Sequence, residues 1–151
     1  MVNLQNIRPE VVIKQEAATN GATLTSDAVD TKGYDYCTFL VHGTTSNSAT
    51  NNPATLRVTE SDDTVATNFA AIAALTGDGA SGFTIPNSPT ATTTAPFAQL
   101  DVNLSGPRKR YLKVEVSPIT TQTFSVIALL SRAEEAPVGT TEQNVAVIGR
   151  G

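Results

Sequence analysis

The sequence predicts an all-β protein: a two-sheet, jelly-roll-like β-sandwich with extended N- and C-terminal segments. Its composition is the first indication, since 40% of the 151 residues are hydrophobic and only 16% are charged. Much of the remainder is Thr, Ser and Asn, a mixture that favours pleated sheets and turns over solvated helices. Several short segments also alternate apolar and polar side chains with a period of two, as strands do. The connections between them are unequal and irregular, which suits a jelly roll better than an up-and-down barrel.

Two neighbouring strands near the end of the domain carry the clearest alternation. Residues 111–116 alternate apolar and polar side chains, the pattern of a strand with one solvated face. In residues 123–130 one face is continuously apolar, and Ile127 and Leu129 make the opposite face apolar as well. This second strand is therefore expected to be covered on both sides, either by a second layer of the same domain or by another molecule.

The remaining strands are shorter and less regular. They are expected at residues 11–13, weakly at 22–30, and at 34–42, 55–60, 64–66 and 97–104. An acidic turn at 61–63 would close a hairpin between 55–60 and 64–66. In residues 68–75 the apolar positions have helical spacing, so a helical turn is one interpretation of that segment. Residues 44–53 are almost wholly Thr, Ser, Asn and Ala, which predicts an exposed loop.

A chain of this length suits one domain with one core. We expect an N-terminal arm at residues 1–8, the sandwich at 9–132 and an extended tail at 133–151. The tail contains Pro and Gly with only scattered valines. The backbone of either end could add a strand to a neighbouring molecule, or both ends could simply be flexible.

Charge and cysteine content exclude several classes of protein. A formal net charge of -4 argues against a nucleic-acid-binding protein, which needs a basic face to displace counterions from phosphates. Cys37 is the only cysteine, so neither an intramolecular disulfide nor a zinc site of several thiolates is expected. No early basic segment leads into a long apolar run, which predicts synthesis in the cytoplasm and no contact with a membrane.

Few residues of this chain could act as catalytic groups, and their spacing in the sequence does not bring them together. His42 is the only histidine, and Cys37 lies five residues before it on the same expected strand. This odd offset places their side chains on opposite faces, so neither a Ser-His-Asp nor a Cys-His arrangement is expected. We predict that the protein is not an enzyme and has no cofactor.

Two loops resemble ligand-binding motifs only superficially. Residues 60–63 are acidic but lack the spacing of a calcium loop, and a solvated hairpin turn is the simpler interpretation. Residues 77–82 match the glycine spacing of a phosphate-binding loop, but no clear strand precedes them. No metal site is predicted in either loop.

A basic run at 108–110, Arg-Lys-Arg, precedes one of the two closing strands. It could contact an acidic protein partner, which we favour over nucleic acid, or it could be a charged strand entrance that keeps a sheet edge soluble. Recognition of sugars is disfavoured because the chain has no Trp and only 5% aromatic residues.

Four segments, taken in order, carry a resemblance that covers most of the chain. They are residues 30–36 (DTKGYDY), 58–63 (VTESDD), 108–114 (RKRYLKV) and 128–137 (ALLSRAEEAP). Together they resemble a family of small virion proteins of tailed bacteriophages and prophages, the head decoration or cement proteins. Residues 44–53 and 77–82 have no counterpart in that pattern.

The resemblance implies a β-sandwich that binds the outside of an assembled capsid and bridges neighbouring major capsid protein subunits. It implies location on the capsid surface of the virion, a homodimer or homotrimer, and a role in binding without catalysis. The candidate partner contacts combine the basic run, the second face of the closing strand and the tail. They are Arg108, Lys109, Arg110, Ile127, Leu129, Arg132, Glu134, Glu135, Val138, Val145, Val147 and Ile148.

The sequence leaves two other functions open. One is a receptor- or glycan-binding module of the virion tail or fibre. The other is a small hydrolase, which the single histidine disfavours.

Overall fold

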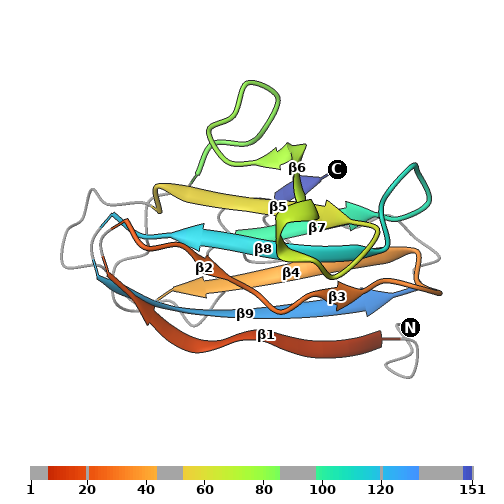
Figure 1. The fold of residues 1–151 in the computed structure, drawn as a ribbon, viewed down its shortest axis with the longest axis horizontal. Coiled ribbons are helices and arrows are strands. Elements are labelled where there is room, and N and C mark those ends of the chain that lie inside the picture. Colours follow the sequence, from red (N-terminus) through yellow and green to blue (C-terminus); the bar gives the residue numbers. More distant parts are fainter. Residues whose placement is uncertain are drawn as a thin grey trace.

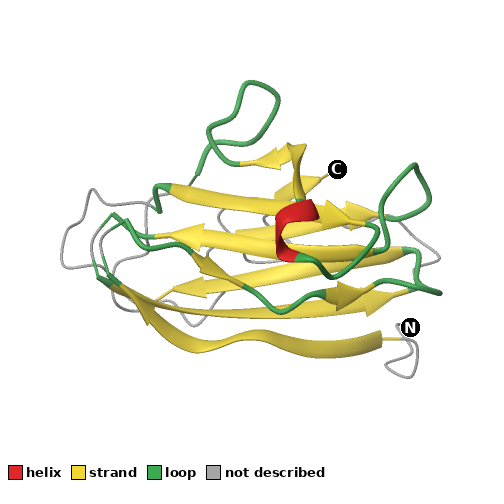
Figure 2. Cartoon of the chain, viewed as in Figure 1, coloured by secondary structure: helices red, strands yellow, loops and turns green. Residues whose placement is uncertain are grey.

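The computed structural model describes residues 7–19, 21–43, 53–85, 98–119, 121–132 and 148–150. These residues form two sheets packed face to face, together with one short 3-10 helix (Figures 1 and 2). The predicted all-β, two-sheet sandwich is confirmed. No helix among the described residues is long and apolar enough to cross a membrane.

Each sheet draws its strands from distant parts of the chain. The first has the order β1 (Ile7–Ala18), β9 (Gln122–Ser131), β4 (Tyr36–Gly43), β7 (Ala98–Asn103) and β10 (Ile148–Arg150). The second has the order β2 (Leu24–Thr25), β8 (Tyr111–Ser117), β5 (Thr55–Ser61) and β6 (Ala70–Thr76), and β3 (Val29–Asp30) also pairs with β8.

This strand order is that of a jelly roll. If β2 and β3 are counted as one interrupted strand, the two sheets have the orders β1-β9-β4-β7 and β2/β3-β8-β5-β6. Between β1 and β9, every connection except that from β5 to β6 crosses from one sheet to the other. All of these neighbours pair antiparallel. β10 is an addition that pairs parallel with β7. The jelly-roll expectation therefore holds for the described strands.

The core lies between the two sheets and is built from the inward side chains of alternating strand positions. The largest fully buried side chains are Phe39, Phe124, Leu56, Leu75, Leu100, Leu112, Leu130, Val29, Val41, Val58, Val102 and Val114. Burying each such side chain contributes roughly 1.5–3 kcal/mol. Cys37 belongs to the same cluster, so the cysteine packs as a small apolar residue.

The edge formed by β2 and β3 is held to β8 by a side chain where the strand is interrupted. The Ser26 backbone N–H donates to the Val114 carbonyl at 2.9 Å, and the Val114 N–H donates to Ser26 Oγ at 2.9 Å. The hydroxyl thus replaces the carbonyl that a continuous strand would supply. The Val114 N–H is therefore not available to pair with a strand of another chain.

The segment at 68–75 departs from the helical interpretation. Residues 70–76 form strand β6, and the 3-10 helix occupies only Ala66–Asn68. Between the pairs Arg57↔Thr76 and Thr59↔Ala71 the register shifts, so β6 carries extra residues as a bulge. The helix-like spacing of Ile72 and Leu75, both buried, comes from this bulge. The hairpin partner of β5 is therefore β6, and the strand predicted at 64–66 is wrong.

Both ends of the sandwich also differ from the predicted boundaries. Ile7 and Arg8 lie in β1 and pair with Ser131 and Leu130, so the first sheet includes two residues assigned to the arm. Residues 148–150 were assigned to the tail, but they pair with β7 of the same chain. The rest of the tail, 133–147, and the predicted loop at 44–52 lie outside the described residues.

Candidate partner-binding surfaces

Eleven of the chain's 24 charged residues lie at one end of the sandwich, the end where the label N stands in Figure 1. β1 begins and β9 ends there, since Ile7 lies opposite Ser131, and β3 and β5 end opposite Tyr111. We call this surface the charged end. Its members are Arg8, Asp30, Lys32, Asp35, Glu60, Asp62, Asp63, Arg108, Lys109, Arg110 and Arg132.

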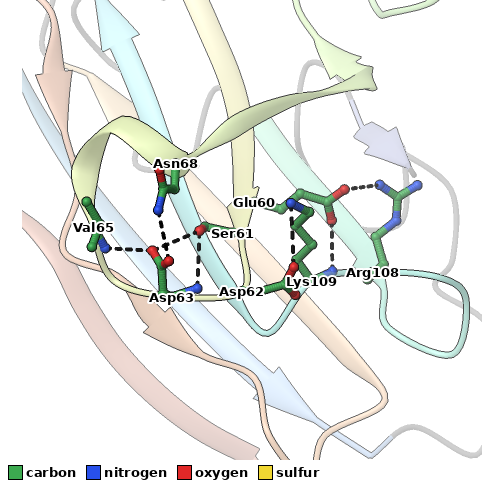
Figure 3. A network of polar contacts seen from close by, with 8 residues as sticks. All are labelled: Glu60, Ser61, Asp62, Asp63, Val65, Asn68, Arg108 and Lys109. Carbon is green, nitrogen blue, oxygen red and sulfur yellow. Dashed lines mark hydrogen bonds and ion pairs between the residues drawn. The ribbon is translucent and has the colours of Figure 1, made fainter.

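At the charged end, the end of β5 and the loop after it supply partners for two residues of the basic run (Figure 3). Arg108 Nη1 lies 3.3 Å from Glu60 Oε1, and the Lys109 backbone N–H donates to Glu60 Oε2 at 3.2 Å. Lys109 Nζ lies 3.6 Å from an Asp62 carboxylate oxygen. One carboxylate, that of Glu60, therefore fixes the chain just before β8 by a side-chain and a backbone contact.

Arg110 forms an ion pair with Asp30 at this end. Its Nε and Nη2 donate to the two oxygens of Asp30 at 2.8 and 2.7 Å. This two-pronged hydrogen bond holds the pKa of Asp30 at about 2 and raises that of Arg110. The Arg110 carbonyl also accepts from the Thr31 hydroxyl at 2.7 Å and from its N–H at 3.0 Å. All three members of the basic run thus have partners within the chain, which is the arrangement expected of a strand entrance.

Two further arginines lie at the same end. Arg132 Nε donates to the Gly33 carbonyl at 2.7 Å, which ties the end of β9 to the turn before β4. Arg8 pairs with Glu10, and its guanidinium carbon lies 6.0 Å from the centre of the Tyr34 ring. Both guanidinium groups nevertheless belong to exposed residues.

The four segments that carry the family resemblance meet here. Residues 30–36 supply Asp30 and Gly33, 58–63 supply Glu60, 108–114 supply the basic run and 128–132 supply Arg132. The basic run and Arg132 are among the candidate contacts named from the sequence, but Asp30 and Glu60 were not identified there as the partners of the basic run. Those partners are 80 and 48 residues away in sequence from Arg110 and Arg108, so only the strand order brings them together.

The acidic tip at 61–63 is a turn held by hydrogen bonds among its own residues (Figure 3). The Asp63 carboxylate accepts from the Val65 N–H at 2.9 Å and from Asn68 Nδ2 at 2.8 Å, and the Asn68 bond is the main reason why its pKa is lowered. Ser61 Oγ accepts from the Asp63 N–H at 3.2 Å. No group of three His, Cys, Asp or Glu residues among the described residues could hold a metal ion. The turn holds Val65 outward, with 54% of its surface exposed.

A second surface lies on the outer face of the first sheet. Ile127 of β9 has Val11 of β1 as its partner on one side and Leu40 of β4 on the other. Two residues further along β9, Leu129 lies between Pro9 of β1 and Thr38 of β4. We call Pro9, Val11, Leu40, Ile127 and Leu129 the apolar row.

The apolar row explains the second apolar face of β9. Ile127 and Leu129 are half-buried and point away from the core, and Val11 is 51% exposed. Toward β7 the same face becomes polar, because Asp101 accepts hydrogen bonds from Thr38 Oγ1 at 2.7 Å and Gln99 Nε2 at 3.0 Å. The second face is therefore not part of the core of the sandwich.

The reactive residues remain apart, as their spacing predicts. Cys37 is fully buried, and burial raises its pKa well above the usual range, so its thiol stays protonated. His42 is exposed at the other end of β4, beside Ser125 of β9. Cys37 and His42 therefore do not form a nucleophile–base pair.

The glycine-rich loop has a packing role. A Cβ at Gly77 would lie 2.3 Å from a side-chain carbon of Ile85, and one at Gly82 would lie 1.7 Å from the Thr76 carbonyl oxygen. Asp78 Oδ1 accepts the Ile85 N–H at 3.0 Å, so its carboxylate serves the loop itself. The glycine spacing thus reflects close backbone approach within this loop.

The other candidate contacts lie in the C-terminal part of the chain. Glu134, Glu135, Val138, Val145 and Val147 lie outside the described residues. The backbone of Ile148 begins β10 and has Gln99 of the same chain as its partner.

Comparisons with known proteins give no match: no family model, no curated protein and no solved structure matches this chain.

Proposed function

We propose that this protein is a structural component of a phage virion, a cement protein that binds the outside of an assembled capsid and bridges neighbouring major capsid protein subunits. The observation that best supports this proposal is the use made of the chain's polar residues. At the charged end they hold loops from both sheets in a fixed arrangement, while the cysteine is buried and the histidine stands apart from it. A rigid β-sandwich of this kind is suited to adhesion.

The physical mechanism is stabilisation by mass action. A ligand that binds the assembled lattice, and not its free subunits, lowers the free energy of the lattice. Symmetry repeats each weak contact many times over a shell, and a dimer or trimer on a symmetry axis would gain further from its high effective concentration. Each copy therefore needs only a modest interface.

The resemblance of four segments to decoration proteins supports the choice of partner, and the jelly-roll order of the described strands fits the fold which that resemblance implies. The partners proposed are the major capsid protein and further copies of this chain. We propose no cofactor, no nucleic acid and no membrane as a partner, and no enzymatic activity. The protein would be made in the host cytoplasm and act at the capsid surface.

Binding to shells tests the proposal. Purified protein is added to capsids of its phage that lack it, and bound protein is measured after sedimentation. We expect saturable binding, together with greater resistance of the decorated shells to heat and low ionic strength. If the protein does not bind and the shells are no more fragile without it, the cement function is wrong. Binding of the isolated protein to host cells or to glycans instead would favour the tail-module alternative.

A further inference from the structure

We propose that the outer face of the first sheet, over β4 and β7, is the docking site of this chain's own residues 133–147, which cross it between β9 and β10. The surface concerned runs from Thr38 and Leu40 of β4 to Gln99 and Asp101 of β7. This inference goes beyond the proposed function and does not depend on it, because its tests need no capsid.

The first argument is the direction of the two strands that residues 133–147 connect. β4 runs antiparallel to both β9 and β7, and β10 runs parallel to β7, so β9 and β10 are parallel strands of one sheet. Parallel strands cannot be joined by a hairpin, and their connection passes over one face of the sheet as a crossover. The inner face is closed to it, because Phe39, Leu100 and Val126 are fully buried between the sheets. The crossover therefore belongs on the outer face.

The hand of this crossover agrees with the outer face. Ser131 points outward, because its neighbour Leu130 is buried in the core, and its carbonyl accepts the Asp35 N–H at 3.1 Å just before β4. In a strand of L-residues that runs upward, a side chain facing the viewer has its carbonyl on the right. Seen from outside with β9 upward, β4, β7 and β10 therefore lie to the right of β9. A connection over that face is right-handed, as nearly all crossovers between parallel strands are.

Residues 133–147 are long enough for this route. The end of β9, Ser131, is level with Asn103 of β7, since both pair with the same residue of β4, and Ile148 of β10 is level with Gln99. The two ends thus lie four residues apart along the strands and three strand spacings apart across them, a direct distance of about 20 Å. Residues 133–147 span about 50 Å when extended, so they can cross the face with length to spare.

The outer face of β7 is buried where this route crosses it. Gln99 and Asp101 are only 6% and 4% exposed, whereas Asn103, on the same face of the same strand, is exposed. The direct line from the end of β9 to the start of β10 passes between Gln99 and Asp101 and leaves Asn103 to one side. The described strands form two layers, and neither lies over this face. Because the uncovered face of a sheet stays in contact with water, a further part of the chain covers these two side chains.

Exposure rises across the outer face with distance from the route. Thr38 and Leu40 of β4 and Ile127 of β9 are half-buried, and Val11 of β1 is 51% exposed. A crossover from β9 to β10 passes over β4 and β7 and does not reach β1, which is this order of exposure. A separate molecule seated on the apolar row would instead cover Val11.

The composition of residues 133–147 suits the face that they would cover. They include Val138, Val145 and Val147, which can pack on half-buried side chains such as Leu40, and several Thr, Gln and Asn residues that can bond to the polar groups of β7. The same three valines were named from the sequence as contacts for a partner. In this proposal their partner is the same chain, so neither they nor this face is left to bind the shell.

Photo-crosslinking in the full chain identifies the occupant. A photoreactive diazirine residue encoded in place of Leu40 should be joined to residues 133–147 on irradiation. Trypsin releases residues 133–150 as one peptide, because no Lys or Arg lies between its ends. Mass spectrometry should therefore find this peptide attached to the peptide that carries position 40.

The control carries the same diazirine residue in place of Val11, which lies in the apolar row but off the route, and it should not capture peptide 133–150. Equal capture from both positions would overturn the proposal. Capture of residues 86–97 from position 40 would assign the cover to the segment before β7, and covalent dimers would assign it to a second copy. Absence of any captured peptide would mean that the face is open to water.

Thiol labelling gives a second measurement. In a chain that ends at Arg132, Leu40→Cys should react at least about fivefold faster than in the full chain, and Val11→Cys should change by less than about twofold. The buried Cys37 shows whether the shortened chain is folded, since it stays unlabelled in an intact core. Equal rates for Leu40→Cys in both chains, with Cys37 still unlabelled, would reject the proposal. If the shortened chain does not fold, crosslinking in the full chain decides. Neither result bears on capsid binding, so the proposed function is tested separately.

Discussion

Asp30 and Arg110 show how one ion pair can join two loops that are distant in sequence. The pair links the end of β3 to the residue before β8, and the Thr31 hydroxyl adds a bond to the Arg110 carbonyl. Both side chains are more than a third exposed, so solvent screens their attraction and their effect on stability is modest. The pair contributes mainly to the positioning of the two loops.

Acid should weaken this contact in a defined range. The pKa of Asp30 is lowered from 3.8 to about 2, so its stabilising contribution is complete above pH 3.8 and is lost as the pH falls toward 2. Asp30→Asn should lower the melting temperature slightly at neutral pH. The difference from the unmodified protein should shrink below pH 3.8. Thermal melts at several pH values measure this.

Asp35→Asn is the control for the acid experiment. Asp35 lies in the same turn, but among the described residues its carboxylate forms no ion pair. We expect this variant to melt like the unmodified protein at neutral pH. A loss as large as that of Asp30→Asn would mean that general charge balance, and not the pair with Arg110, is responsible.

Thr59 of β5 offers a way to raise stability. Its side chain is buried, and its hydroxyl has no hydrogen-bond partner among the described residues. A buried polar group without a partner costs free energy that an apolar group of the same shape would not. Thr59→Val should therefore raise the free energy of unfolding by about 1 kcal/mol, measured by urea denaturation.

Thr38→Val is the matched contrast to Thr59→Val. The Thr38 hydroxyl donates to Asp101 at 2.7 Å, and the Asp101 side chain is buried. Removing that donor should lower stability by about 1–3 kcal/mol. If both variants shifted stability in the same direction, hydrogen bonding would not be the property that separates them.

The elements differ in how far the sequence could predict them. β8 and β9 alternate regularly, and their burial follows the predicted faces. In β6 the bulge places Ile72 and Leu75 inward at a spacing of three, which no period-two pattern could reveal. In β1 a register shift near Val12 places it and the adjacent Ile13 inward together. Bulges depend on the partner strand, so local pattern alone could not place them.

The candidate surfaces were predictable to a similar degree. The charge of the basic run and the second apolar face of β9 can be read from local sequence. Their surroundings could not be, because Glu60 and Val11 reach them only through pairing between distant strands. The residues next to Val65 in the sequence do not indicate that its side chain is exposed, because its position depends on the hydrogen bonds made by Asp63.

The glycine-rich loop after β6 should tolerate no side chain at its closest point. A Cβ at Gly82 would lie 1.7 Å from the Thr76 carbonyl oxygen, so Gly82→Ala must move backbone atoms. We expect a loss of at least about 2 kcal/mol in the free energy of unfolding, as for overpacked sites. Gly106→Ala, where a Cβ would meet nothing within 4 Å, should be close to neutral. Equal effects in urea denaturation would contradict the packing role.

The described fold is held together mainly by contacts between residues that are far apart in sequence. β1 pairs with β9, and β4 lies between β9 and β7, so neither sheet is complete until the last strands are in place. Topologies of this kind fold slowly and cooperatively, because long loops must close before the contacts form. The core between the sheets should therefore open only when most of the molecule unfolds.

Cys37 can report that opening. It lies fully buried in the core, with Val102 and Leu130 as its strand partners, and burial raises the pKa of its thiol. Thiol reagents react with the thiolate, so labelling at pH 8 should be at least about 10³-fold slower in the native protein than in urea. The rate should rise with denaturant in step with global unfolding, measured by circular dichroism on the same samples. Rapid labelling without denaturant would show that β4 separates from its neighbours locally, and that the sandwich does not open as one unit.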